Sequence, residues 1–237
     1  GPGAVDLLTL RAARLLAEAD VVLHDALVSA DVLALASRAK LINVGKRAGR
    51  PSVDQRLINR LLVRAGQRAS VVVRLKGGDP HLFGRATEEI EACRAAGIPV
   101  VTVPGVSAGF AAASALGASL TARGLSRSVT FVTPSAARGG EDNTHWADAA
   151  AAAETAVIYM GAAQAERVRA ALSERGVPLQ RPVALIESAT WAEERVVRGV
   201  LADLPALGAR LGEGPAIMVI GEVAREARAA LEVASAA

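Results

Sequence analysis

Short apolar runs alternate along this chain with longer runs in which apolar residues recur every three or four positions. In the first half, runs such as "VVLH" and "VVVRL" are typical of buried strands, whereas "TLRAARLLAEA" has the interval of an amphipathic helix. This alternation predicts parallel strands that are joined by crossover helices. We expect strands at 20–24, 40–44, 70–75 and 99–103, and helices at 9–19, 31–37, 53–66, 84–96 and 107–117.

The pattern changes beyond this point. Residues 118–127 are polar and carry arginines, and we interpret them as a connector between an N-terminal lobe, residues 1–120, and a C-terminal lobe, residues 121–237. Two apolar runs of the second lobe follow each other with no helix between them, so its sheet should be mixed. The predicted fold class is α/β, with a parallel sheet in the N-terminal lobe and a mixed sheet in the C-terminal lobe. We expect strands of the second lobe at 128–133, 154–160, 183–188, 194–201 and 216–221, and helices at 144–152, 163–175 and 203–210.

Composition narrows the class of protein. The net charge of +3 and an aromatic content of 3% give little basis for nucleic-acid binding. A single cysteine, Cys93, excludes an internal disulfide and fits a reducing compartment, while His24, His81 and His145 lack the spacing of zinc ligands. No apolar run reaches the roughly 18 residues of a membrane span, and no signal peptide is visible. We therefore expect a cytoplasmic protein with no metal, no nucleic-acid partner and no membrane partner.

The segment "KGGDP", residues 76–80, follows an expected strand, which is where open α/β sheets place their ligands. Gly77 and Gly78 allow positive φ and close approach of another group to the backbone. Asp79 could accept hydrogen bonds from a ligand, or it could cap the helix that follows. The spacing leaves both interpretations open. It matches neither a dinucleotide fingerprint nor a P-loop.

Other glycine-rich turns and charged residues occur at the ends of expected elements. "GPGAVD" begins the chain, and "VPGVSAG" contains Ser107 and Ala108, which are small enough for a ligand or a neighbouring helix to lie against them. Asp25 and Lys46 each follow an expected strand, and an acid and an amine in such places can act as base and acid. Position alone favours two solvated loop charges.

Several segments occur together and in one order: "GPG…DLLTLRAARLL", "VGKRAG", "VVRLKGGDPHLFGR", "LTARGLSRSVTFVT", "YMG" and "GPAIMVIGEV". With them the chain resembles the uroporphyrinogen-III C-methyltransferase branch of the tetrapyrrole methylase family. The resemblance implies two α/β lobes with the active site in the cleft between them, and a homodimer. It also implies S-adenosylmethionine (S-adenosyl-L-methionine) as methyl donor with no metal, and a small-molecule tetrapyrrole as substrate. That substrate would be uroporphyrinogen III, converted to precorrin-2 for sirohaem or cobalamin.

The resemblance also assigns roles to individual residues. It implies Asp25 as the proton acceptor and Lys46 as the proton donor. The acceptor carries many carboxylates, so arginines near the site are useful for binding them; the candidates are Arg47, Arg85, Arg123 and Arg127. The implied cofactor-binding residues are Pro2, Gly77, Gly78, Asp79, Leu82, Ser107, Ala108, Met160, Ala189 and Ala216.

Some positions depart from the residues that the family commonly has, among them Ala26, Ala122 and Gly124. The alternatives are therefore another precorrin methyltransferase of cobalamin synthesis and a non-catalytic protein that binds an adenosyl ligand. A related RNA methyltransferase usually has a "SDAG" type of loop where this chain has "KGGD", and the weak basicity argues against it. Relatives carry a strand before the first glycine-rich loop, so we expect native residues ahead of Gly1.

Overall fold

The computed structural model describes residues 1–45, 54–135 and 144–225. The chain divides into two compact units, Gly1–Ala111 and Ala112–Ala237. The lobe boundary expected between residues 120 and 121 stays a prediction. Both units have the predicted α/β character, and each is described by itself below.

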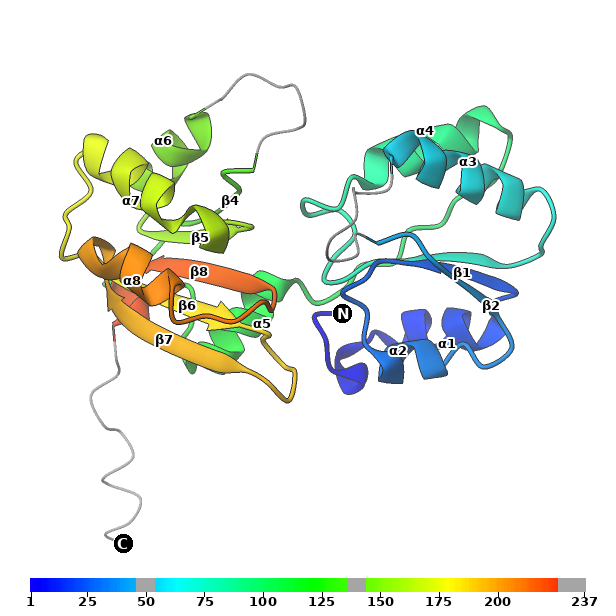
Figure 1. Ribbon diagram of the computed structural model, residues 1–237, viewed down its shortest axis with the longest axis horizontal. Coiled ribbons are helices and arrows are strands. Elements are labelled where there is room, and N and C mark those ends of the chain that lie inside the picture. The colour runs from blue at the N-terminus through cyan, green and yellow to red at the C-terminus, as the bar shows by residue number, and fades with distance from the viewer. Residues whose placement is uncertain (46–53, 136–143, 226–237) are drawn as a thin grey trace, which may run out of the picture. The chain divides into compact units, whose positions relative to one another are not determined.

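The first unit is built on a parallel sheet. Its described strands have the order β2-β1-β3 (Lys40–Asn43, Val21–His24 and Val72–Leu75). Figure 1 shows helices on both faces of this sheet. One face carries α1 (Leu10–Glu18) and α2 (Ala30–Ala34), and the other carries α3 (Gln55–Gly66) and α4 (Ala86–Ala95).

Apolar packing on both faces explains why the strands of this unit are apolar throughout. On the face of α1 and α2, Leu16 packs with Val22 and Val32. On the face of α3 and α4, Leu23 packs with Ile58. Three of these helices are capped at their N-termini by a side-chain oxygen that accepts a backbone N–H group. This agrees with the usual preference for polar N-cap residues. The capping residues are Thr9, Ser29 and Asp54.

The strand predicted at 99–103 is wrong. These residues have no regular secondary structure, and the side chain of Val101 is 75% exposed. A strand requires a partner for its backbone groups, and within the described residues no strand pairs with this segment. The apolar sequence "PVVTV" therefore had the composition of a strand without a neighbour that could complete it.

The second unit contains a five-stranded sheet of order β4-β5-β8-β6-β7. β4 and β5 are parallel, whereas β8 is antiparallel to both of its neighbours and β6 is antiparallel to β7, so the predicted mixed sheet is confirmed. The strands are β4 (Val129–Val132), β5 (Thr155–Tyr159), β6 (Pro182–Glu187), β7 (Arg195–Val200) and β8 (Ala216–Gly221).

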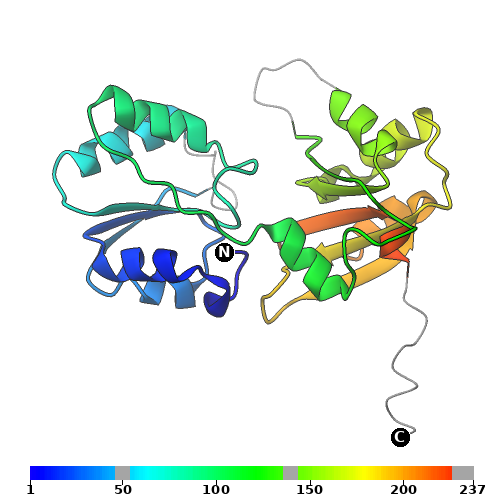
Figure 2. The same ribbon diagram turned by 180° about the vertical axis from the view of Figure 1, so that it is seen from behind.

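Helices cover both faces of this second sheet. On one face α6 (His145–Ala152), α7 (Ala165–Glu174) and α8 (Leu204–Gly208) enclose the larger apolar core. Figure 2 shows α5 (Ala108–Leu116) on the opposite face from α8. The remaining predicted strands and helices are present with their ends shifted by at most three residues. Short 3₁₀ turns lie at Val5–Leu7, Ala162–Gln164, Leu201–Asp203 and Glu222–Ala224.

Candidate active site

Three glycine-rich turns that are far apart in the sequence meet at the carboxyl end of the first sheet. Gly78 donates its N–H to the carbonyl of Gly1 at 2.7 Å, and the Gly1 amine donates to the carbonyl of Gly78 at 3.1 Å. Gly105 belongs to the third turn, and a Cβ there would lie 2.4 Å from the Gly78 carbonyl oxygen. These three glycines are called the glycine junction below. Gly105 has no room for a side chain because backbone meets backbone there, and Gly78 has a φ of +69°, which favours glycine.

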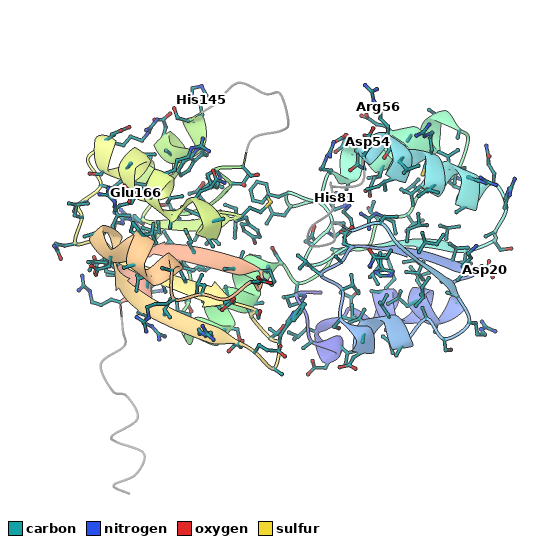
Figure 3. The ribbon with its side chains drawn as sticks, viewed as in Figure 1. Asp20, Asp54, Arg56, His81, His145 and Glu166 are labelled. Atoms are coloured by element: carbon teal, nitrogen blue, oxygen red, sulfur yellow. The ribbon has the colours of Figure 1, made fainter. Side chains whose placement is uncertain are left out.

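Asp79 holds two parts of this junction together. Its Oδ1 accepts the N–H of His81 at 2.8 Å, which closes the turn after β3, and its Oδ2 accepts the N–H of Gly105 at 3.0 Å. Figure 3 labels His81 in this loop and Asp20 at the opposite end of the sheet. The helix-cap interpretation of Asp79 is wrong, because α4 begins at Ala86 and has Arg85 in its N-cap position.

The predicted cofactor residues of the first unit gather around the same junction. A Cβ on Gly78, whose φ is +69°, would lie 3.5 Å from the nitrogen of Ala108 and 3.9 Å from Cα of Ser107. Nothing lies within 4 Å of a Cβ on Gly77, so this position is open. The backbone N–H of Leu82 donates to the Asp79 carbonyl in the same loop.

Pro2 belongs to the same assembly through its neighbours. It lies between Gly1, which is bonded to Gly78, and Gly3, whose carbonyl accepts the Ser29 hydroxyl at 3.2 Å. The first turn is therefore tied both to the loop after β3 and to the start of α2. Together these contacts bring seven of the ten predicted cofactor residues to one end of one sheet.

Asp25 directly follows β1 at the same edge. Its backbone N–H donates to the Leu75 carbonyl at 3.3 Å, which keeps the start of this loop beside β3. Its predicted partner, Lys46, lies outside the described residues. Gly45 is the last described residue before Lys46, and a Cβ there would lie 1.9 Å from the nitrogen of Ala26. The loops after β1 and β2 therefore touch at Ala26 and Gly45.

A buried charge network lies behind Asp25. Arg74 of β3 donates from Nη2 to Oδ1 of Asp25 at 2.5 Å and from Nε to Oε1 of Glu89 at 3.2 Å. Lys76, two residues further along, places Nζ 3.1 Å from each carboxylate oxygen of Glu89. Burial lowers the pKa of the Lys76 amine, and the Arg74 guanidinium lowers this pKa further, while Glu89 acts in the opposite direction. The four formal charges of these residues sum to zero.

This network was not predicted as part of the site. A signal existed in "VVRLK", where two cations alternate with apolar residues on one face of a buried strand, followed by the acidic pair of "ATEEI". Buried cations require partners, so the pattern could have indicated an ion pair between β3 and α4. Nothing in the sequence connected that pair to Asp25, which lies 49 residues earlier.

The three predicted cofactor residues of the second unit also share one edge of a sheet. Met160 follows β5, Ala189 follows β6, and Ala216 begins the antiparallel strand β8, which pairs with both. Ser188 donates its N–H to the Pro215 carbonyl at 2.8 Å, which joins the end of β6 to the start of β8.

The backbone at this edge is unusual. Met160, Ser188 and Thr190 have φ values of 55°, 51° and 71°, so Ala189 lies between two strained neighbours. Non-glycine residues in this region cost about 1–3 kcal/mol each and gather at functional sites. Met160 is half exposed despite being apolar. These features favour a ligand-binding role for this edge, although sequence motifs alone supplied the candidates.

The predicted arginines have diverse surroundings. Arg85 forms two hydrogen bonds to the Glu88 carboxylate, at 2.7 and 2.8 Å. The backbone N–H of Arg127 donates to Glu154. Arg123 is exposed, and Arg47 lies outside the described residues. An acceptor-binding role for these residues stays a prediction.

Within the described ranges, no group of three or more His, Cys, Asp or Glu residues could hold a metal ion. Among the helices of the described part of the chain, none is both long and apolar enough to cross a membrane.

Glycine-lined loops lie at the carboxyl ends of the parallel strands, with a hydrogen-bonded acid beside them. This arrangement is typical of α/β enzymes that bind small-molecule ligands. The chain belongs to the tetrapyrrole (corrin/porphyrin) methylase family, whose sequence model matches residues 1–205. The family inferred from the sequence motifs is therefore confirmed.

Curated relatives include siroheme synthases, which are about twice as long as this chain. Siroheme synthase of Tolumonas auensis is 45% identical over 225 residues, which cover 94% of this chain and 48% of that protein. Siroheme synthase 1 of Serratia proteamaculans is 47% identical over 224 residues, covering 94% and 47%. The chain thus spans about half the length of the curated relatives that it matches.

Solved structures match over nearly their whole length. A crystal structure of uroporphyrin-III C-methyl transferase from Thermus thermophilus, complexed with S-adenyl homocysteine, has a TM-score of 0.82 and 38% identity, with 95% of each chain covered. A cobalamin biosynthetic enzyme, cobalt precorrin-4 methyltransferase, has a TM-score of 0.80 and 29% identity, with 95% of this chain and 93% of that chain covered.

Proposed function

We propose that this chain is an S-adenosylmethionine-dependent methyltransferase that converts uroporphyrinogen III to precorrin-2. The observation that carries the proposal is the glycine junction, around which seven of the ten cofactor residues expected from family motifs lie at one end of a parallel sheet. The similarity of the chain to a uroporphyrin-III C-methyl transferase complexed with S-adenyl homocysteine supports S-adenosylmethionine as the cofactor.

The residues at the junction fit an adenosyl ligand. Gly77 leaves open space where a side chain would stand, and Ser107 and Ala108 add little bulk beside Gly78. The cofactor would be held by Pro2, Gly77, Gly78, Asp79, Leu82, Ser107 and Ala108 in the first unit and by Met160, Ala189 and Ala216 in the second. When bound, S-adenosylmethionine supplies a methyl group on a positively charged sulfur, so a ring carbon can form the new bond without a metal.

The chain's own residues would then orient the acceptor and move protons. Alignment of the two reactants is the main task, because a well-aligned pair reacts far faster than a freely diffusing one. Asp25 would accept the proton that the tetrapyrrole loses after methylation, and Lys46 would donate one. Arginines such as Arg85 and Arg123 would bind acceptor carboxylates through charge-assisted hydrogen bonds.

A second candidate is a methyltransferase acting on a later precorrin. Two observations favour keeping it: the similarity to cobalt precorrin-4 methyltransferase, and the departures at Ala26, Ala122 and Gly124. A third candidate, a non-catalytic adenosyl-ligand-binding protein, would retain the glycine junction without turnover.

In the experiment, the purified chain is incubated with methyl-labelled S-adenosylmethionine in two parallel reactions. One contains uroporphyrinogen III and the other contains a later precorrin. We expect label in a dimethylated product from uroporphyrinogen III, and much slower labelling when Asp25→Asn replaces the parent. Label that enters only the later precorrin would support the second candidate. Calorimetric binding of S-adenosylhomocysteine without labelling of any acceptor would favour the third.

We also propose that the product feeds sirohaem or cobalamin synthesis, that the chain works in the cytoplasm, and that it forms a homodimer with neither nucleic acid nor membrane as partner. The names of the curated relatives support the sirohaem branch. Light scattering of the purified chain tests the dimer, since a monomeric mass at assay concentration would contradict it.

A further inference from the structure

The two oxygens of the Asp25 carboxylate have different surroundings. Oδ1 accepts a hydrogen bond from Nη2 of Arg74 at 2.5 Å. Within the described residues, Oδ2 has no hydrogen-bond partner, and the side chain is 32% exposed. A carboxylate that is held through one oxygen keeps the other available to take a proton.

Arg74 is itself fixed in place. Its side chain is 13% exposed, and Nε donates to Glu89 while Nη1 donates to the Leu75 carbonyl at 2.9 Å. The guanidinium is planar, so bonds in three directions leave it little freedom to rotate. Glu89 is also held by Nε2 of Gln55 at 3.1 Å, which ties the network to α3 as well as α4.

We propose that Arg74 is a positioning residue for methyl transfer, which holds Oδ1 of Asp25 so that Oδ2 is presented to the substrate and takes the proton. This role rests on the proposed function. In the step concerned, a bond to hydrogen in the methylated, cationic tetrapyrrole breaks and its electron pair returns to the ring. The proton forms an O–H bond on Oδ2, so the ring becomes neutral and Asp25 becomes a carboxylic acid. Glu89 supports the role by anchoring Nε of Arg74.

A purely structural role for Arg74 predicts a different result. In that case the loss of Arg74 would destabilise the first unit and lower kcat by the same factor whether residue 25 is Asp or Asn. If Arg74 acts through Asp25, its loss should matter only while Asp25 can accept a proton. A double-mutant cycle between the two residues separates these possibilities.

The experiment measures kcat, KM for uroporphyrinogen III and the affinity for S-adenosylhomocysteine in the parent chain, Arg74→Met, Asp25→Asn and the double variant. We expect Arg74→Met to lower kcat about 100-fold, the order that misplacement of a catalytic group produces. Affinity for S-adenosylhomocysteine should stay within about twofold. The double variant should be no slower than Asp25→Asn alone.

Leu16→Ala is the matched control, because Leu16 packs on the opposite face of the sheet and its truncation destabilises the unit without touching Asp25. Its kcat should equal that of the parent below its melting temperature. If Arg74→Met does not fold, Glu89→Gln and Arg74→Lys enter the same cycle with Asp25→Asn. Both should lower kcat less than Asp25→Asn does, and neither should slow the Asp25→Asn enzyme further.

Full kcat in the Arg74 and Glu89 variants, or losses that multiply with that of Asp25→Asn, would overturn the positioning role while leaving the proposed function intact. A parent chain that binds S-adenosylhomocysteine but methylates no tetrapyrrole would overturn the proposed function, and the role of Arg74 with it. Methylation of uroporphyrinogen III by the parent chain therefore distinguishes a failure of the positioning role from a failure of the proposed function.

Discussion

Gly1 and Gly78 exchange two backbone hydrogen bonds across 77 residues of sequence, at 2.7 and 3.1 Å. Because these bonds join main-chain atoms, they tie the two loops together directly, and the Asp79 side chain adds further bonds in the second loop. Gly105 lies against the same carbonyl. A ligand that binds at these loops would meet a pre-formed backbone, which lowers the ordering cost of binding.

Gly105→Ala should damage both stability and cofactor binding. Its Cβ would lie 2.4 Å from the Gly78 carbonyl oxygen and 3.2 Å from the Gly1 nitrogen, so backbone must move. We expect the free energy of unfolding to fall by about 1–3 kcal/mol, as in other overpacked sites. Urea unfolding and calorimetry with S-adenosylhomocysteine measure the two effects.

Gly77→Ala should affect cofactor binding but not stability, in contrast to Gly105→Ala. Its Cβ meets nothing within 4 Å of the protein, so the free energy of unfolding should stay within about 0.5 kcal/mol of the parent. If the cofactor lies against this position, its affinity should nevertheless fall about tenfold or more. Unchanged affinity for S-adenosylhomocysteine in Gly77→Ala would place the cofactor elsewhere.

Asp79→Ala should weaken the fold as well as the binding of the cofactor. The substitution removes the acceptors for His81 and Gly105, and hydrogen bonds to charged groups contribute roughly 1.5–3 kcal/mol each. Chemical denaturation should show a loss of about 2 kcal/mol or more. Asp54→Ala is the control, since Asp54 caps α3 in an exposed position and its loss should cost about 1 kcal/mol without changing affinity. Unaltered stability in Asp79→Ala would contradict the loop contacts.

Met160→Gly should separate stability from ligand affinity. The left-handed backbone of Met160, with φ of 55°, costs a side chain roughly 1–2 kcal/mol that glycine does not pay. Glycine loses more entropy on folding, so we expect thermal stability to be equal or slightly higher, while affinity for S-adenosylhomocysteine falls.

Met160→Ala completes this comparison, because it removes the same side-chain contact but keeps the strain. It should match Met160→Gly in affinity and melt at a lower temperature. Equal affinity in the parent and both variants would remove Met160 from the cofactor site.

Glu154→Gln should reveal a pH-dependent contribution to stability. The backbone N–H of Arg127 lowers the pKa of the Glu154 carboxyl, with a further contribution from the N–H of Ser128 at 3.2 Å. A carboxyl whose pKa is lower in the folded state stabilises the fold above its ordinary pKa, and this stabilisation is lost as the pH falls through the lowered value. Melting curves of the parent and the variant should therefore differ at neutral pH and converge in acid. Parallel curves from pH 7 to strongly acidic pH would show that the carboxylate contributes nothing.

Local pattern predicted most of the fold because most elements bury an uninterrupted apolar face. The mixed second sheet was predictable from the short spacing between the strands that became β6 and β7. Residues 99–103 show where this reasoning fails, because a strand depends on a neighbour and its own composition does not supply one.

The candidate site was predicted unevenly for a similar reason. Motifs supplied Gly78, Asp79 and Asp25, but pattern alone could not show that Asp79 bonds to Gly105 or that Arg74 reaches Asp25. Both contacts join residues that are distant in sequence, and their geometry follows from the packing of the sheet. The helix-cap alternative for Asp79 considered only its neighbours in sequence. In the structure α4 begins seven residues later, at Ala86, and Asp79 bonds to the distant Gly105.

The glycine junction also has an evolutionary consequence. Its main constraint on the sequence is that Gly105 carries no Cβ and that Gly78 has a positive φ, while Asp79 supplies the carboxylate that binds Gly105. Because main-chain atoms make these contacts, side chains around the junction can change during evolution while the backbone of the loops keeps its shape. A scaffold of this kind separates the part of a protein that must be inherited from the part that is free to vary.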